Sequence, residues 1–398
     1  PGKHTITFTE RINIGRKSKW GFGTFRLLAV DHNIVFDGDG HSGLLRVEQG
    51  AHVTLSGITF KNGAVTSTDL DMTGMPRGGY QGAAVLLMIK TSVIVYRCNF
   101  ENNHAISTSA RFGGGGAIKA ETFAKLIVWG CSFKNNKASV GGAIAASSAT
   151  VLYVARSTFD GNVAVGGLDG SRKHKGRVRP KLLVKGGAVR VDSVEGHESD
   201  AEHVLFCNSK FVNNQIIFKH GDFERMGLTE SESEEDLFAG AAAVYTWNSP
   251  DNLKLDSGDK HFLSMKGCVF DGNSEDVDTL TNKAGMYVFQ AEGAGHAGVH
   301  DLIFRNNKVR GVVAKFDNSN KYTGHNFNLE LRNIKFENNG DVKNLAFEVH
   351  KHQSSCSLVN VQGIPDANSD CSTAAAAAAQ AADTEVVLVD DSIPVESS

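Results

Sequence analysis

Residues 131–136 read Cys-Ser-Phe-Lys-Asn-Asn, and residues 141–144 read Gly-Gly-Ala-Ile. Segments similar to the first of these recur along most of the chain, each with a phenylalanine that is followed by turn-forming residues. The nine phenylalanines are Phe36, Phe60, Phe100, Phe133, Phe159, Phe211, Phe270, Phe304 and Phe336. Because units that repeat at such intervals are typical of solenoids and related architectures, the repeat decides the fold prediction.

The residues that follow each phenylalanine predict a turn and a ladder. The second residue after it is Gly or Asn in all nine repeats, and these two types tolerate a left-handed backbone best. The third residue is Asn in seven repeats, and Asn side chains stacked in successive coils can hydrogen bond to one another. The predicted ladder consists of Asn103, Asn136, Asn162, Asn214, Asn273, Asn307 and Asn339.

The residues before each phenylalanine predict short strands. Apolar residues alternate there, as at 126–128 and 152–154, and the residue two positions before the phenylalanine is small or apolar throughout. This pattern predicts a strand, a slight bend, a second strand and then the turn. Gly-Gly-Ala segments, such as those at 115–117 and 186–188, begin a further strand.

Two or three short strands in a core of about 24–34 residues fit one coil of a parallel β-solenoid. A leucine-rich repeat would need a helix between strands, and a propeller would need four strands per blade. We therefore predict an all-β protein, a right-handed parallel β-helix of about nine to eleven coils with loop insertions. A short helical or extended cap is expected at the C-terminal end, where residues 374–379 are all alanine.

The alternation of Phe-x-x-Asn with Gly-Gly-Ala-[Ile/Leu/Val] resembles the repeat of chlamydial polymorphic outer membrane proteins. More broadly, the pattern is similar to that of the pectin-lyase-like right-handed β-helix superfamily, and the resemblance covers residues 30–350. It implies the fold but says little about function, because such solenoids serve as adhesins, lyases, epimerases and virion spikes.

Length and composition set the domain prediction. The chain has 398 residues, of which 41% are hydrophobic, and a solenoid of this size need not divide into globular domains. We predict an N-terminal coil region at 1–29, the parallel β-helix at 30–355, and a C-terminal cap with an alanine-rich linker at 356–398.

Charge and targeting signals bound the partners and the location. The formal net charge is −3, which gives no reason to expect a nucleic-acid partner. No apolar run approaches the roughly 18 residues of a membrane helix, so no transmembrane segment is predicted. The chain begins at Pro1 without a signal peptide. We expect a mature protein or a fragment, extracellular or on the cell surface, whose targeting signal is not in this sequence.

The cysteines fall into two groups. Cys98, Cys131 and Cys268 occupy the small position before the repeated phenylalanine, which predicts buried apolar side chains. Cys98 and Cys131 belong to adjacent coils and are expected to be stacked free thiols. Cys356 and Cys371 lie outside the repeat and close a short loop, which predicts a disulfide if the protein is extracellular.

Four insertions interrupt the repeat, at 64–80, 166–184, 216–238 and 246–261. The second is basic, so that it is either a solvated loop or a contact for an anionic polymer or an acidic neighbour. Its cationic residues are Arg172, Lys173, Lys175, Arg177, Arg179 and Lys181. The third contains an acidic stretch at 229–236 that could pair with the basic insertion, bind Ca²⁺ weakly or be solvated. No cofactor is predicted beyond this weak Ca²⁺ candidate.

Candidate catalytic residues are few. Arg190 lies close in sequence to Asp192 and Glu195, which is the best local grouping of a cation with carboxylates. For polysaccharide lyases, the resemblance implies carboxylate ligands for Ca²⁺ and an Arg or Lys base on a sheet face. For hydrolases, it implies paired carboxylates. The Gly-Gly-Ala strands instead present mainly Ala, Ser and Lys, so no catalytic residue is assigned.

These observations favour a non-enzymatic structural or adhesion-type protein. Its rod would present the four insertions to a glycan or protein surface, and loops from neighbouring coils would lie side by side. Two alternatives stay open: a polysaccharide lyase or epimerase that acts on an anionic glycan, and a subunit of a filament or virion assembly.

Overall fold

The computed structural model describes most of the chain. The described residues are 3–15, 24–29, 33–67, 82–107, 114–147, 150–174, 177–192, 204–219, 222, 237–248, 261–277, 287–293, 295–318, 327–340, 342–349 and 355–363. The basic hairpin is described by its backbone, and its side chains lie outside this set. The elements of the described part are 39 strands in five sheets.

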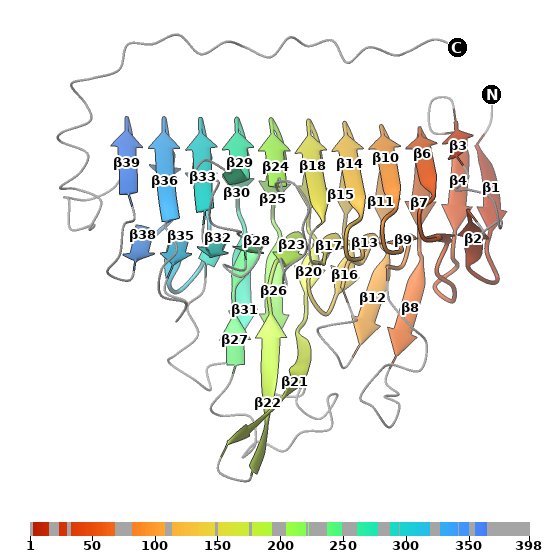
Figure 1. Ribbon diagram of the computed structural model, residues 1–398, viewed down its shortest axis with the longest axis horizontal. Helices are drawn as coiled ribbons and strands as arrows, with labels where there is room; N and C mark the ends of the chain where they lie inside the picture. The colour runs from red at the N-terminus through yellow and green to blue at the C-terminus, as the bar shows by residue number, and fades with distance from the viewer. Residues whose placement is uncertain are drawn as a thin grey trace.

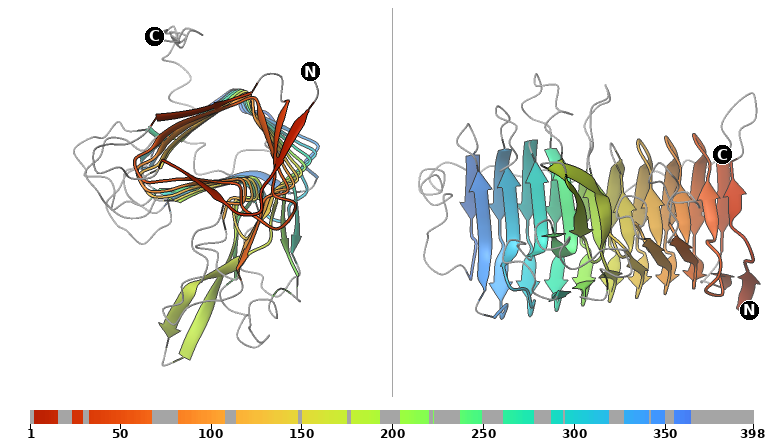
Figure 2. Two further views of the ribbon diagram at one scale, coloured as in Figure 1. Left: turned by 90° about the vertical axis from the view of Figure 1, so that its right-hand side faces the viewer. Right: turned by 90° about the horizontal axis from the view of Figure 1, so that it is seen from below.

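Three ten-stranded parallel sheets form the sides of a triangular prism (Figures 1 and 2). Sheet I carries the repeated phenylalanines. Its strands are β1 (His4–Thr7), β4 (Ile34–Asp37), β7 (Ile58–Lys61), β11 (Asn99–Glu101), β15 (Ser132–Lys134), β19 (Thr158–Asp160), β25 (Lys210–Val212), β30 (Val269–Asp271), β34 (Ile303–Arg305) and β37 (Lys335–Glu337).

Sheet II includes the strands that follow the Gly-Gly-Ala segments. Its strands are β2 (Ile12–Ile14), β5 (Leu45–Val47), β9 (Val85–Leu87), β13 (Ile118–Ala120), β17 (Ile144–Ala146), β23 (Val189–Asp192), β28 (Ala241–Asn248), β32 (Tyr287–Gly293), β35 (Val312–Asn318) and β38 (Lys343–Val349).

Sheet III precedes sheet I within each coil. Its strands are β3 (Thr24–Leu28), β6 (His52–Ser56), β10 (Ser92–Tyr96), β14 (Lys125–Trp129), β18 (Val151–Ala155), β24 (Val204–Cys207), β29 (His261–Lys266), β33 (Gly295–His300), β36 (Phe327–Arg332) and β39 (Ser355–Val359). Ten strands in each sheet give ten coils, and the predicted right-handed parallel β-helix with its number of coils is confirmed.

Two smaller sheets lie outside the prism. Sheet IV contains β8 (Ala64–Ser67), β12 (His104–Ser107), β16 (Lys137–Ala138), β20 (Val163–Ala164), β26 (Gln215–Phe218) and β31 (Ser274–Val277). Sheet V contains β21 (Gly167–His174), β22 (Arg177–Val184) and β27 (Leu237–Ala239), and β21 and β22 form an antiparallel hairpin that projects from the rod (Figure 2). The sequence analysis did not predict sheet IV.

The phenylalanine stack holds the core together. Successive rings from Phe60 to Phe336 lie with their centroids 4.6 to 5.2 Å apart and their planes within 13° of each other. Strands one coil apart are separated by almost the same distance, so each ring meets the ring of the next coil without distortion of the sheet. Apolar residues of sheets II and III, such as Ile118 and Leu126, complete the core.

The second position after the phenylalanine has a left-handed backbone in eight of the nine turns, as at Asn135, where φ is 54°. The exception is Gly38, since the positive φ values fall on Asp39 and Gly40. In this tight turn the Ser42 N–H donates a hydrogen bond to the Gly38 carbonyl. A Cβ at Gly38 would lie 2.5 Å from the Ser42 carbonyl oxygen, so glycine is needed for close approach rather than for φ.

The seven asparagines at the third position form one continuous ladder. In the middle of it, the Asn136 Nδ2 group donates to Asn162 Oδ1 at 2.9 Å and to the Phe100 carbonyl at 3.0 Å. Its Oδ1 accepts the backbone N–H and the Nδ2 group of Asn103 at 3.1 and 3.0 Å. Since Asn136 is fully buried, the ladder replaces water as the partner of these groups.

The first coil is the open end of the core. Ile6, Ile12 and Phe25 pair in register with core residues of the second coil, but they are 48%, 49% and 37% exposed. Residues 4–28 of the predicted N-terminal coil region therefore supply the first strand of each of the three main sheets. The C-terminal residues 364–398, with the predicted cap, lie outside the described residues.

Replacement of Asn136 with alanine should lower the free energy of unfolding by about 3 kcal/mol or more, because four buried polar groups each lose a hydrogen bond at once. These groups are the Asn103 N–H, the Asn103 side-chain amide, the Phe100 carbonyl and Asn162 Oδ1. Urea unfolding followed by circular dichroism measures the change.

The matched control is Asn135→Gly, one position earlier in the same turn. Glycine occupies this position at Gly161 and Gly272 with nearly the same φ, so the control should change the stability by less than about 1 kcal/mol. Equal losses for the two variants would show that the ladder contributes no more than the turn does.

Candidate functional site

The outward face of sheet II carries polar side chains that are closed to solvent. On β13, Ile118 and Ala120 belong to the core cluster, so Lys119 between them points outward, yet it is only 5% exposed. Outward residues of sheet III, such as Ile94 at 41%, are far more exposed. Sheet II therefore differs from the other faces of the prism in being covered.

Strand register places the buried polar residues in one row across sheet II. Arg190 on β23 pairs with Tyr245 on β28, and Tyr245 pairs with Gln290 on β32. Gln290 in turn pairs with Lys315 on β35. Each of these four residues is less than 10% exposed. The parallel register thus brings together residues that are far apart in the sequence.

Arg190 and Asp192 are two of the three predicted candidates. Arg190 lies in this row, Asp192 lies in the neighbouring row with Trp247, and the two are joined by an ion pair. They occupy alternate positions of β23, between which Val191 points into the core. The third candidate, Glu195, lies outside the described residues. The structure therefore assigns two of the predicted residues to sheet II.

Tyr245 is the centre of the network. Its hydroxyl accepts a hydrogen bond from Lys185 Nζ at 2.8 Å and donates one to Glu292 Oε2 at 3.0 Å. The Lys185 ammonium also lies 4.0 Å from the centroid of the Tyr245 ring, within the range of a cation–π contact. Burial, together with the nearby Glu292 and Asp192 carboxylates, raises the pKa of Tyr245 well above its usual value, so the hydroxyl keeps its proton.

Lys119 and Glu121 form the other end of the polar row. The Lys119 Nζ atom lies 4.0 Å from Glu121 Oε1, and both residues are less than 10% exposed. Burial lowers the pKa of Lys119, and the Glu121 and Asp192 carboxylates partly oppose that shift. A lysine with a lowered pKa is a chemical signature of some catalytic sites.

The arrangement nevertheless fits a structural network better than a catalytic site. The cations and carboxylates engage one another, and Arg190, Lys119 and Tyr245 are each less than 10% exposed. Among the described residues, no three His, Cys, Asp or Glu side chains are placed to hold a metal ion. The hydrogen bonds of Tyr245 join three neighbouring coils, those of β23, β28 and β32.

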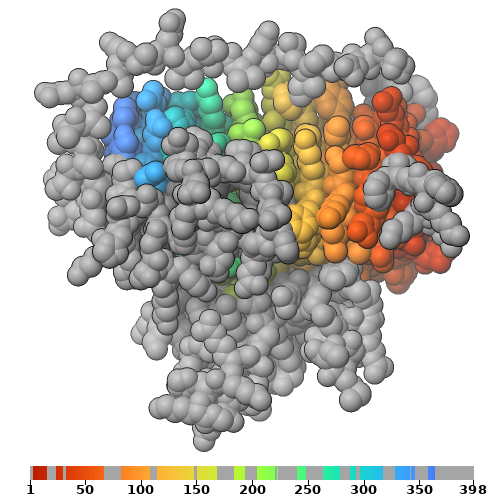
Figure 3. Space-filling view, in the orientation of Figure 1, coloured from red at the N-terminus to blue at the C-terminus, as the bar shows by residue number. Residues whose placement is uncertain are grey.

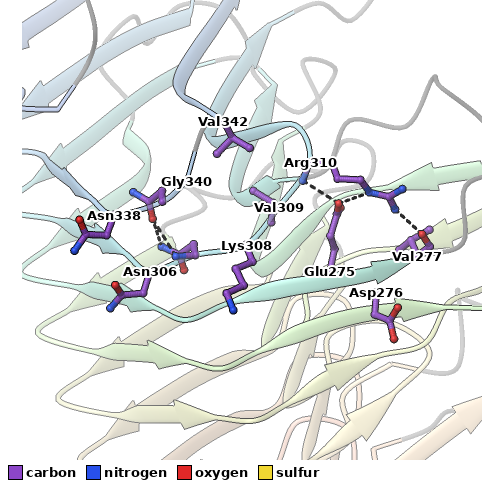
Figure 4. Close-up of a pocket in the computed structure, with 12 residues that line it drawn as sticks. Glu275, Asp276, Val277, Asn306, Lys308, Val309, Arg310, Asn338, Gly340 and Val342 are labelled. Carbon is purple, nitrogen blue, oxygen red and sulfur yellow. Dashed lines mark hydrogen bonds and ion pairs between the residues drawn. The ribbon is translucent and has the colours of Figure 1, made fainter.

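A second polar feature is a groove of about 620 Å³ at the end of sheet IV (Figure 4). Its best-ordered interaction joins Arg310 to the edge strand β31. The backbone N–H and the Nε of Arg310 donate to Glu275 Oε1 at 2.9 and 2.6 Å, and its guanidinium also donates to the Val277 carbonyl. Arg310 thus occupies the position that a further strand would take and protects the edge of sheet IV.

The predicted basic residues lie on the hairpin of sheet V. In its backbone register Arg172 is opposite Arg179, and His174 is opposite Arg177. Lys173 belongs to β21 and Lys181 to β22, whereas Lys175 lies outside the described residues. The hairpin therefore concentrates the cationic residues on one projection.

The predicted insertions leave the rod at both long edges of sheet II. Those at 64–80, 166–184 and 216–238 follow or include strands of sheet IV, and the one at 246–261 joins sheet II to sheet III. The predicted boundaries are too wide, because the first begins with strand β8 and the second ends at Val184, which is fully buried in the core.

The cysteines before the repeated phenylalanines are free and buried. The backbone N–H of Cys98 donates to Cys131 Sγ at 3.4 Å, so the two thiols stack in adjacent coils. Burial raises the pKa of Cys98 to about 11 and that of Cys131 to about 12. Cys356 belongs to β39, but its side chain and Cys371 lie outside the described residues.

Comparison with known families supports the repeat. Residues 130–147 match the Chlamydia polymorphic membrane protein repeat, and this segment contains the residues with which the sequence analysis began. No curated protein matches the chain. Within the described ranges, no helix is long and apolar enough to cross a membrane.

Sequence reasoning missed Tyr245, Glu292, Lys185 and Gln290. Long insertions separate them, and the Gly-Gly-Ala signal is degenerate at 240–244, so the register of β28 could not be read from the repeat. The available signal was the preceding apolar residue, since Arg190 and Tyr245 both follow a core valine.

Replacement of Tyr245 with phenylalanine should lower the free energy of unfolding by about 2 kcal/mol, because a partly buried ammonium and a partly buried carboxylate both lose a hydrogen bond. The control is Tyr153→Phe, on the half-exposed outward face of sheet III, which should change it by less than about 0.5 kcal/mol. Denaturant midpoints that move equally would contradict the structural role of the network.

Proposed function

We propose that this protein is a non-enzymatic, extracellular or cell-surface β-helix whose insertions bind a glycan or protein partner. The observation that carries the proposal is that the described strands next to the four insertions lie along the two edges of sheet II, so that the insertions begin and end near one face of a stiff rod. Repeat proteins commonly use such extended surfaces for recognition. The match to a membrane-protein repeat supports a surface location.

The basic hairpin is the best-defined contact for an anionic partner. Arg172 opposes Arg179 in the antiparallel register, and cross-strand pairs of like charge destabilise a hairpin. An anionic polymer or an acidic protein surface would offset that repulsion. The hairpin also projects away from the prism, so a partner can approach it from several directions (Figure 2).

The closed network on sheet II argues against the main alternative. A lyase or epimerase of this fold would need a cation and carboxylates that a polysaccharide can reach. Arg190 is 8% exposed and already paired with Asp192. The filament or virion alternative is favoured only by the exposed apolar residues of the first coil, such as Ile6 and Ile12.

A charge-neutral hairpin tests the proposal directly. A variant in which the six cationic residues at 172, 173, 175, 177, 179 and 181 become glutamine should melt within a few degrees of the wild type. The hairpin strands pair outside the prism, so the core is unchanged. Its binding to immobilised heparin, used as a model anionic polymer, should weaken at least tenfold, because each lost cation removes a contact with a sulfate or carboxylate group of the polymer.

The control variant neutralises Lys134, Lys210 and Lys335, which are exposed on sheet I. It should bind like the wild type. If both variants weaken equally, the binding follows net charge and the hairpin is not the contact. Formation of unsaturated product from polyuronates, with or without Ca²⁺, would overturn the non-enzymatic proposal.

A further inference from the structure

The outward face of sheet III carries a continuous apolar and aromatic strip over three neighbouring coils. Parallel register aligns Ile94, Ile127 and Tyr153 in one row, and Tyr96 with Trp129 in the next. Ile94 is 41% exposed, and the other four are half-buried. Five such side chains in direct strand contact form a patch, whereas single exposed apolar residues are common.

The strip is confined to this part of the face. Farther along the rod, the row of Tyr153 continues as Leu205, Ser264, Gly298 and Glu330, and the row of Trp129 continues as Ala155, Cys207, Lys266, His300 and Arg332. Leu205, Ala155 and Cys207 lie next to the strip, and the residues beyond them are glycine or polar, as on a solvated sheet. The aromatic residues of coils three to five are therefore a local departure from the pattern and not a property of the repeat.

Cationic side chains border the strip on both sides. The guanidinium of Arg97 lies 5.1 Å from the centroid of the Tyr96 ring, and that of Arg156 lies 5.1 Å from the Trp129 ring. Both arginines are exposed, as are Lys90 and Lys125 at the opposite edge. Stacking on the rings holds the arginines in place, so their donors are already ordered at the margin of the strip.

Carboxylates are displaced from this surface. Glu101 and Asp160, which follow Arg97 and Arg156 within the same coils, belong to β11 and β19 of sheet I. Glu121, on the sheet II side, is 8% exposed. The surface thus combines an apolar centre with cations on both margins, and it excludes acidic groups from its middle.

We propose that this strip binds a linear anionic polysaccharide that runs along the rod axis. The apolar faces of sugar rings pack against Tyr153, Ile127 and Trp129, while carboxylate or sulfate groups receive paired hydrogen bonds from Arg97 and Arg156. A chain in this direction crosses successive strands and meets the same two rows at every coil. A protein partner or a second copy fits less well, because the exposed charged residues named at the described margins are all cationic.

The inference rests on the proposed glycan-binding role, but it places a contact on the rod itself. Sheet III forms the upper side of the prism in Figure 1, and the basic hairpin projects from the lower side. The two surfaces can therefore be varied separately. A polysaccharide bound to the strip does not have to contact any insertion.

The test uses affinity electrophoresis of the full chain in gels that contain heparin, polygalacturonate or neutral dextran. Two double variants are compared with the wild type. One carries Arg97→Gln and Arg156→Gln, and the other carries Trp129→Thr and Tyr153→Thr. Each should bind at least one of the anionic polymers at least fivefold more weakly than the wild type. Comparison of heparin with polygalacturonate separates sulfate from carboxylate recognition. The dextran gel should not retard any of these proteins.

The matched control is Lys266→Gln with Arg332→Gln on the polar part of the same face, which should bind like the wild type. Circular dichroism confirms that each variant is folded, and the conservative Trp129→Tyr variant should keep most of the binding. Unchanged binding of both folded strip variants would overturn the inference, and so would retardation of the proteins by dextran. A change in self-association of the strip variants without a change in polysaccharide binding would also overturn it.

The hairpin variant distinguishes this inference from the proposed function. If neutral hairpin residues abolish binding while the strip variants bind normally, the inference fails and the proposed function stands. If the strip variants lose binding and the hairpin variant does not, the inference stands and the insertions are not the glycan contact. If the wild type binds neither anionic polymer, the inference fails. The proposed function then stands only as binding of a protein partner by the insertions.

Discussion

The fold depends on one constraint, which is that buried polar groups at the turn must find partners inside the rod. Seven of the coils bend through a left-handed residue after the phenylalanine, and the asparagine that follows it is buried in the core. Asparagine meets the constraint because its amide both donates and accepts, so each side chain bonds to the coils on both sides. The phenylalanine stack then fixes the spacing that makes those bonds possible.

A rigid framework of this kind leaves recognition to two sorts of surface. Insertions leave the framework at the edges of sheet II, where added residues do not disturb the stack. The flat outward faces of the sheets differ among themselves, with a closed polar network on sheet II and an open aromatic strip on sheet III. The same strand register that builds the core also brings these outward residues into rows.

Much of the fold could be predicted from the sequence, because the constraint at the turn acts locally. Gly or Asn two residues after the phenylalanine marks each bend, and only Gly38 departs from the rule. The network around Tyr245 could not be predicted in the same way. Its members Lys185 and Glu292 are separated from Tyr245 by insertions, and the strand register on which their contact depends is set by tertiary packing.

The most direct test of this account is amide hydrogen exchange at the ladder. The backbone N–H groups of Asn103, Asn136, Asn162, Asn214, Asn273 and Asn307 each donate to the side chain of the next coil. They should exchange only through the most global opening of the rod and as slowly as the strands of sheet I. Exchange at these six positions as fast as in exposed turns would contradict the claim that the ladder holds the coils together.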